Sequence, residues 1–533
     1  MSGKSFVKGA VVLSVAGILA KCLGALYRIP FARIASDECG AIYSLVYPVY
    51  NLLLALSTAG IPLAISKLVA EYEEQGKSGM SMRILKLSLL LLSVVGICVA
   101  GFIFINADWL AVHVLHEERT ALSLRAIAPA MIFTCMQAVF RGYFQGLQQM
   151  VPTALSQITE QFVRVGVIIT ALFVLLPYGD TVVAAGASSG ASVGSCVAFL
   201  LILTVFLFYQ RKHGVKRQSA EENAIGNCQI LGKVLALAIP ISIGSLVLPI
   251  MQSIDSVLLL PRLMASGLTK EAALIEVNYL STCVQPIINL PFMLTTAIAA
   301  SLVPNISEAL AMGQKENVTV NFSNAMQLAI LIVLPATVGL MTLARPIMAL
   351  LYDKPGAGVA MLWSAAVVLV VGLYQISAGT LQGMGKAMVP MYSLLLGAAI
   401  KIVITYTCTA MPAMGVRGAA LGSVVGFAVA AANNIFQVSR RIGWSWLSLR
   451  YHIIKPVISV AAMAVLVLGS YYGLFALLGS NGLATLAAIV IGGCVYFVVL
   501  LAIGGVSLEI IRKMPKVGNK LAALLLKLKL VRE

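Results

Sequence analysis

Charged residues are scarce in this sequence. They make up 11% of its 533 residues, whereas a soluble globular domain carries about 25%. So few charges cannot cover the surface of a chain of this length with hydrated groups. The composition therefore excludes an ordinary water-soluble protein.

Residues that hold metals or carry out catalysis are also missing in the patterns that such sites need. The nine cysteines form no CxxC pair and there are only four histidines, so we expect neither a metal site nor a disulfide framework. No HExxH motif, Walker loop or working pair of carboxylates occurs. We therefore expect a protein that is not an enzyme and has no cofactor.

Long hydrophobic runs are abundant instead, and 60% of the residues are hydrophobic. Runs of about 20 apolar residues are long enough to cross the hydrocarbon core of a bilayer as helices. The sequence therefore predicts an all-α membrane protein with about fourteen transmembrane helices. The predicted spans are 7–34, 40–66, 84–106, 121–145, 153–177, 182–209, 233–258, 278–303, 324–344, 359–383, 390–411, 417–438, 453–478 and 482–503.

The formal net charge of +17 reflects membrane topology rather than nucleic-acid binding, because the Lys and Arg do not form an aromatic-interleaved stripe. In the gaps between the predicted spans, with the residues at span ends included, 24 Lys or Arg lie on the side of the termini and 7 lie on the opposite side. The positive-inside rule then places both termini in the cytoplasm. Residues 504–533 form a basic cytoplasmic tail, and the segment 509–533 within it is expected to lie as an amphipathic helix on anionic membrane lipids.

An internal repeat divides the chain. Thr58 and Thr295 head matching segments 237 residues apart, and Pro152 and Pro390 follow matching Gln-Gly pairs. Because a copy of six helices begins and ends on the same side, both copies run in the same direction. We expect two pseudo-symmetric six-helix lobes, residues 1–210 and 233–438, joined by a cytoplasmic linker, residues 211–232, with two extra helices at 453–503.

Matching small-residue motifs predict close helix packing in each lobe. They are Gly186, Gly190 and Gly194 in one copy and Gly418, Gly422 and Gly426 in the other.

Ionisable residues inside the spans mark candidate functional positions, because charge is costly at membrane depth. Lys21 and Arg28 share one face of the first helix, and Glu160 can pair with Arg164 one turn away. Bases outnumber acids within the spans, which suits an anionic ligand. The candidate cavity cations are Lys21, Arg28, Arg164 and Lys401, and the supporting polar residues are Glu160, Gln157, Asp255 and Asn51. Arg125 and Arg141, near helix ends, are expected to extend toward the interface.

Several segments resemble a known family. Lys21-Cys-Leu-Gly24, Gly60-Ile-Pro-Leu-Ala-Ile-Ser-Lys67 and the run from Phe140 to Arg164 are similar to the stage V sporulation protein B and polysaccharide-biosynthesis branch of the multidrug/oligosaccharidyl-lipid/polysaccharide flippase superfamily. This resemblance implies two facing lobes, alternating access and a bacterial cell-membrane location. It also implies that cations of the first helix hold a pyrophosphate, and that helices 453–503 form a groove for an isoprenoid tail.

The resemblance implies export of an undecaprenyl-pyrophosphate-linked peptidoglycan or polysaccharide precursor, with lipid II flippases as relatives and cell-wall synthesis enzymes as protein partners. The span 278–303 contains no Lys or Arg, although the lipid II flippases carry a cation on that helix. A multidrug/cation antiporter of the same superfamily is one alternative, and it should offer carboxylates in its cavity. A non-transporting scaffold for cell-wall or spore-cortex synthesis is another, and it would not need cations at membrane depth.

Overall fold

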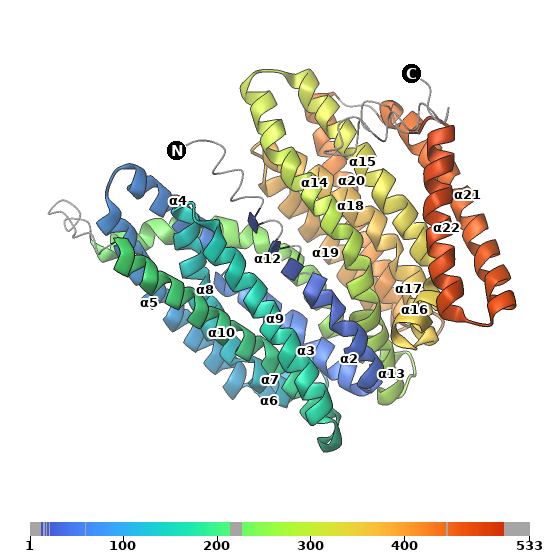
Figure 1. The fold of residues 1–533 in the computed structure, drawn as a ribbon, viewed down its shortest axis with the longest axis horizontal. Coiled ribbons are helices and arrows are strands. Elements are labelled where there is room, and N and C mark those ends of the chain that lie inside the picture. The colour runs from blue at the N-terminus through green and yellow to red at the C-terminus, as the bar shows by residue number, and fades with distance from the viewer. Residues whose placement is uncertain are drawn as a thin grey trace. The chain divides into compact units, whose positions relative to one another are not determined.

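A computed structural model describes residues 12–13, 16–17, 19–20, 22–58, 60–213, 226–443 and 446–505 (Figure 1). These residues are almost entirely helical, and thirteen of the described helical segments are long and apolar enough to cross a membrane. The predicted first span is described in part, and its end forms α2 (Arg28–Ile34). The expectation of an all-α membrane protein with about fourteen transmembrane helices is confirmed.

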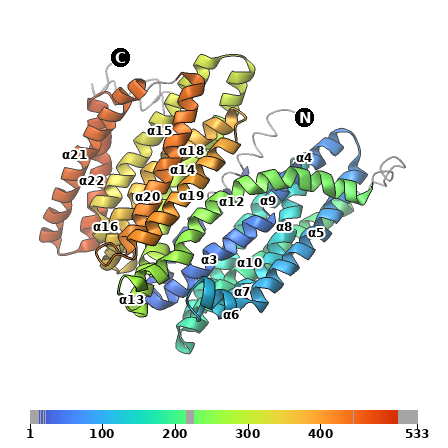
Figure 2. The same cartoon turned by 180° about the vertical axis from the view of Figure 1, so that it is seen from behind.

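Contacts divide the chain into two compact units, residues 1–282 and 283–533. The first unit is helical throughout its described part, and Figure 2 shows the long helix α12 lying along α3. Its helices in chain order are α2 (Arg28–Ile34), α3 (Asp37–Thr58), α4 (Ile61–Glu74), α5 (Ser78–Ile105), α6 (Ala107–Trp109), η1 (Leu110–Val114), α7 (Thr120–Ile127), α8 (Pro129–Gly146), α9 (Met150–Val174), η2 (Leu176–Tyr178), α10 (Asp180–His213), α12 (Asn227–Ala265) and α13 (Lys270–Asn278).

The second unit begins inside a π-helix, η3 (Tyr279–Val284), which leads directly into α14. Its last two helices, α21 and α22, pair with each other along α15 and α16 (Figures 1 and 2). The helices of this unit are α14 (Gln285–Ala311), α15 (Lys315–Thr342), α16 (Ala344–Tyr352), η4 (Pro355–Ala357), α17 (Gly358–Ser364), α18 (Ala366–Gly383), α19 (Met388–Cys408), α20 (Val416–Ile442), α21 (Trp446–Leu478) and α22 (Asn481–Ala502).

The boundary between the compact units differs from the division that the repeat predicts. The helix α12, expected to open the second lobe, packs with the first unit because Ser253 donates a hydrogen bond of 3.0 Å to the carbonyl of Pro48 on α3. Gly60 likewise lets α4 approach α12, since a Cβ there would lie 2.1 Å from the carbonyl oxygen of Ala238. The repeat-based lobe limits stay a prediction. Most of the expected linker and nearly all of the basic tail lie outside the described residues.

The matching glycine motifs do pack helices closely in both units. In the first, a Cβ on Gly194 of α10 would lie 2.7 Å from the carbonyl oxygen of Glu160 on α9. In the second, a Cβ on Gly426 of α20 would lie 3.1 Å from Cβ of Lys401 on α19. Each motif therefore allows its helix to pack closely against the neighbouring helix at a predicted site residue, Glu160 in the first unit and Lys401 in the second.

Candidate functional site

A buried ionic cluster on α9 lies at the centre of the candidate site. Glu160 and Arg164 are only 8% and 6% exposed, and their side chains form an ion pair of 2.9 Å. This is the pairing that the one-turn spacing predicts. The carboxylate compensates the guanidinium at a depth where an isolated charge would be strongly unfavourable.

Arg141 of α8 joins the same cluster, and the expectation that it extends toward the interface is wrong. Its guanidinium lies 2.9 Å from the second carboxylate oxygen of Glu160, and it also donates hydrogen bonds to Gln137 (2.5 Å) and Ser156 (3.0 Å). The side chain turns inward because a carboxylate on the adjacent helix can satisfy it there. Two guanidinium groups thus share one carboxylate, and the cluster carries a net positive charge.

A series of tyrosines runs from this cluster toward α2. Arg164 donates a hydrogen bond to the hydroxyl of Tyr47 on α3, and its guanidinium also lies 5.8 Å from the centre of the Tyr47 ring. The Tyr47 ring is 5.9 Å from those of Tyr43 and Tyr50, and the hydroxyls of Tyr43 and Tyr27 are 2.8 Å apart. Sequence reasoning did not select these tyrosines. Their spacing of four and three residues on α3, which places them on one helix face, could have indicated them.

Arg28 stands at the start of α2, next to Tyr27. Its guanidinium donates a hydrogen bond of 3.0 Å to the carbonyl of Ser281, which lies in the π-helix η3. Short π-helical turns are rare and are frequently found at functional sites. Asn278, the last residue of α13 immediately before η3, donates a hydrogen bond to Asp37 at the start of α3 (2.7 Å). Arg28 therefore links the first helix to the irregular turn that precedes α14.

The other predicted site residues occupy separate positions. Lys21 lies outside the described residues. Lys401 is buried on α19 in the second unit, 237 residues after Arg164, the same interval that separates the repeated segments. Asp255 is buried on α12, while Asn51 on α3 and Gln157 on α9 are partly buried in the unit that holds the ionic cluster.

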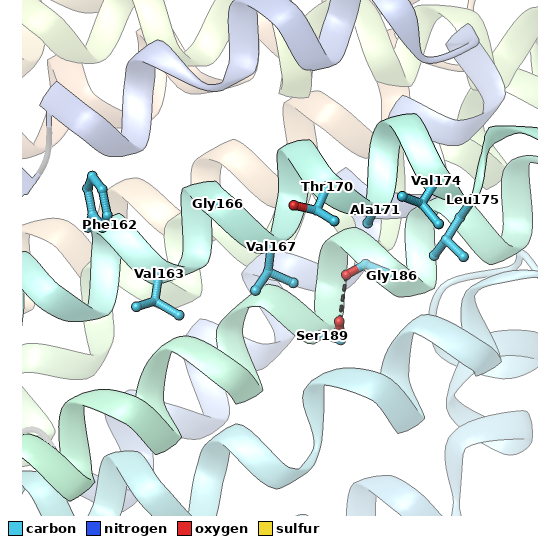
Figure 3. A pocket seen from close by; sticks show the side chains of 10 residues that line it. All are labelled: Phe162, Val163, Gly166, Val167, Thr170, Ala171, Val174, Leu175, Gly186 and Ser189. Carbon is cyan, nitrogen blue, oxygen red and sulfur yellow. Dashed lines mark hydrogen bonds between the residues drawn. The ribbon is translucent and has the colours of Figure 1, made fainter.

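A groove of about 550 Å³ between α9 and α10 is distinct from this cluster. Figure 3 shows its lining, which contains no charged side chain, and Ser189 in it donates a hydrogen bond of 2.6 Å to the carbonyl of Gly186. Phe162 at its edge is 68% exposed. Because its lining offers no charged group, we do not assign this groove to the binding of a charged ligand.

The geometry favours neither a serine-hydrolase site nor a metal site in the part of the chain that the structure describes. Residues Gly186–Gly190 match GxSxG, but Ser188 lies inside α10 and donates its hydroxyl to the carbonyl of Ala184 (2.8 Å). The nucleophile of such enzymes needs a sharp strand-to-helix turn that exposes it. Among the described residues, no cluster of His, Cys, Asp and Glu has the arrangement of a metal site.

A second ionic cluster lies between the spans of the first unit. Glu117 is 1% exposed and accepts from Arg119 (2.8 Å) and Lys270 (3.1 Å), and Arg119 also contacts Glu38 at 2.5 Å. Burial acts to raise the pKa of Glu117, but the hydrogen bonds from Arg119 and Lys270 outweigh it and lower that pKa. The cluster joins the η1–α7 loop to the beginnings of α3 and α13.

Comparison with known proteins identifies the family. Residues 6–310 match the family model described as polysaccharide biosynthesis protein, and residues 281–407 match the model described as MatE. The chain is similar to three proteins of Bacillus subtilis (strain 168). They are the uncharacterized membrane protein YabM (31% identity, covering 97% of this chain and 96% of the relative), stage V sporulation protein B (27%, 97% and 99%) and the lipid II flippase MurJ (25%, 88% and 88%).

Solved structures show the same fold. The lipid II flippase MurJ in an inward closed conformation matches with a TM-score of 0.67 at 15% identity, covering 92% of this chain and 98% of that one. An inward-facing multidrug resistance MATE family transporter matches with a TM-score of 0.66 at 18% identity, covering 82% and 98%. Since the family model covers more than half of the sequence and YabM aligns over nearly its whole length, the chain belongs to the polysaccharide biosynthesis protein family, within the multidrug/oligosaccharidyl-lipid/polysaccharide flippase superfamily.

Proposed function

We propose that this protein is a flippase that moves an undecaprenyl-pyrophosphate-linked peptidoglycan or polysaccharide precursor from the cytoplasmic to the outer leaflet of the bacterial cell membrane. Both termini lie in the cytoplasm, and alternating access carries the headgroup across. Membership of the family supports this proposal, as does the similarity over most of the chain to a lipid II flippase and to stage V sporulation protein B.

The observation that carries the proposal is the net positive charge of the buried cluster. Arg141 and Arg164 share the single carboxylate of Glu160, so one positive charge at membrane depth is left without an acid partner in the cluster. A pyrophosphate supplies the missing negative charge, and arginine can hold two phosphate oxygens at once.

The residues have distinct roles in this mechanism. Tyr47 and Gln137 fix the two arginines of the cluster, and Arg28 releases the carbonyl of Ser281 when it engages the headgroup. The cations that contact the substrate during its passage are Lys21, Arg28, Arg164 and Lys401, and the supporting polar residues are Glu160, Gln157, Asp255 and Asn51. No bond is broken, so the protein acts without enzymatic chemistry. Outward movement of an anion in an inside-negative membrane is favourable by about 2.3 kcal/mol per charge per 100 mV.

A cation antiporter of the same superfamily fits the cluster less well. An antiporter needs a carboxylate that is free to bind a proton or a cation. Glu160 is instead held by two guanidinium groups, which occupy both of its carboxylate oxygens. A scaffold for cell-wall enzymes would not need such a cluster at all.

The test is transport by the purified protein in vesicles that contain a fluorescent lipid-linked diphosphate sugar, with a reagent that reports only the outer leaflet. We expect the wild-type protein to accelerate transfer and Arg164→Gln to abolish it while the protein stays folded. Arg125→Gln, which removes an exposed arginine paired with Asp108 (2.6 Å), is the matched control and should transport normally. Normal transport by Arg164→Gln, or proton-coupled drug efflux without lipid transfer, would refute the proposal.

A further inference from the structure

The second unit contains a cavity of about 720 Å³ at one end of its helices. It is lined by residues from the end of α15, from α16, η4 and α17, from the start of α20, from the last third of α21 and from the first residue of α22. Two arginines, Arg345 and Arg417, contribute to the lining, and no acidic residue does. The positive-inside rule places this end of the unit on the outer side of the membrane.

Both arginines are available to a ligand. Neither side chain has a hydrogen-bond or ion-pair partner within the part of the chain that the structure describes. In the first unit, by contrast, the cations Arg119, Arg125 and Lys270 outside the membrane core each contact a carboxylate. The two arginines of this cavity therefore form a positive site that the protein does not neutralise itself.

The cavity wall is fixed by hydrogen bonds. Asn481 at the start of α22 accepts from the hydroxyls of Tyr471 (2.9 Å) and Thr485 (3.2 Å), and its amide donates to the carbonyl of Pro346 (3.2 Å). These bonds tie α21 and α22 to α16 immediately after Arg345. The stem of Arg345 is also confined, because a Cβ on Gly358 would lie 2.5 Å from its Cγ.

Aromatic and aliphatic side chains surround the two charges. Tyr471 stacks on Phe475 with ring centres 5.9 Å apart, and Tyr472, Trp363 and Leu468 are 65%, 39% and 37% exposed in the same lining. Tyrosine and tryptophan gather where a bilayer meets water, which is also the depth of lipid phosphates. A site with arginines at the level of the headgroups and apolar side chains beside them matches a lipid better than a soluble anion.

We propose that this cavity binds the phosphate of an anionic lipid in the outer leaflet. Arg345 and Arg417 hold the phosphate oxygens through charge-assisted hydrogen bonds, and the positive end of the α20 dipole adds to the attraction. The aromatic side chains contact the glycerol or the first part of the chain. Two lipids carry this chemistry, a resident anionic phospholipid and an isoprenyl diphosphate. The proposal does not depend on whether the protein is a flippase.

Native mass spectrometry of the full-length protein tests this site. The probes are dioleoyl phosphatidylglycerol, dioleoyl phosphatidylcholine, farnesyl diphosphate and inorganic phosphate, each titrated separately and in competition. We expect one anionic lipid to bind with an affinity that falls about tenfold or more in the Arg345→Gln, Arg417→Gln double variant, because each lost bond involves a charged group. The corresponding double lysine variant keeps the charge but loses the planar fork, so its affinity should be intermediate.

The matched control is the Arg440→Gln, Arg441→Gln double variant, which makes the same change of charge at the opposite end of α20 and should bind as the wild type does. An equal loss in this control would overturn the proposal, since binding would then follow net charge alone. Equal affinity for phosphatidylcholine, or displacement of the lipid by an equal concentration of inorganic phosphate, would also overturn it. Competition between phosphatidylglycerol and farnesyl diphosphate identifies which lipid the site prefers, and either order supports a lipid phosphate site.

Discussion

Replacing Glu160 with glutamine tests the ionic cluster most directly. The change keeps the shape of the side chain but removes the negative charge that Arg141 and Arg164 share, each at 2.9 Å. All three side chains are at least four-fifths buried, with exposed fractions of 16%, 11% and 8% for Arg141, Glu160 and Arg164. Glu160→Gln therefore leaves two buried guanidinium groups without a counter-ion.

Removing one partner of a buried ion pair typically costs about 3–5 kcal/mol. We expect Glu160→Gln to lower the free energy of unfolding by about this amount, measured by chemical denaturation of the purified protein in detergent. Glu71→Gln, the same change at an exposed position on α4, should have an effect within about 0.5 kcal/mol of zero.

A second substitution shows whether the loss is due to charge. Arg141→Met in the Glu160→Gln background restores the net charge of the cluster, so the double variant should be more stable than the sum of the two single losses predicts, by about 0.5–3 kcal/mol. Strict additivity, or a Glu160→Gln protein as stable as the wild type, would refute the reasoning. The arginines would then be solvated, and Glu160 would not compensate them.

Three further predictions concern topology, the substrate and pH. In a cysteine-free background, Lys315→Cys should react with a membrane-impermeant reagent only after lysis and His113→Cys in intact cells, and the reverse pattern would contradict the charge-based topology. Arg28→Ala should abolish precursor export at normal protein levels and Arg28→Lys should retain part of it, whereas the control Arg125→Ala should export normally. Normal export by Arg28→Ala would show that this arginine has only a structural role, through its hydrogen bond to η3. Because the pKa of Glu117 is lowered in the folded protein, its contribution to stability is complete above the ordinary carboxyl pKa of about 4.3 and declines as the pH falls below it. Thermal unfolding between pH 3 and 7 should therefore depend less on pH in Glu117→Gln, and unchanged pH dependence would mean that its ion pairs are not formed.

The spans could be predicted from the sequence because membrane insertion depends on a local property. A run of about 20 apolar residues is readable wherever it occurs, and the predicted limits 153–177 and 417–438 lie within a few residues of α9 and α20 at their starts. The pairing of Glu160 with Arg164 was equally accessible, since helix geometry alone brings residues four apart together.

Contacts between helices could not be predicted from the sequence. Arg141 reaches Glu160 across 19 residues, and Arg164 reaches Tyr47 across 117. The sequence shows that Arg141 lies near a helix end, which favours extension toward the interface. It does not show that the neighbouring helix offers the carboxylate of Glu160. The sequence by itself determined how many helices cross the membrane, in what order, and which charges lie within the predicted spans. Only the tertiary structure decided which of those charges meet, because the facing of one helix toward another depends on the packing of all the helices around them.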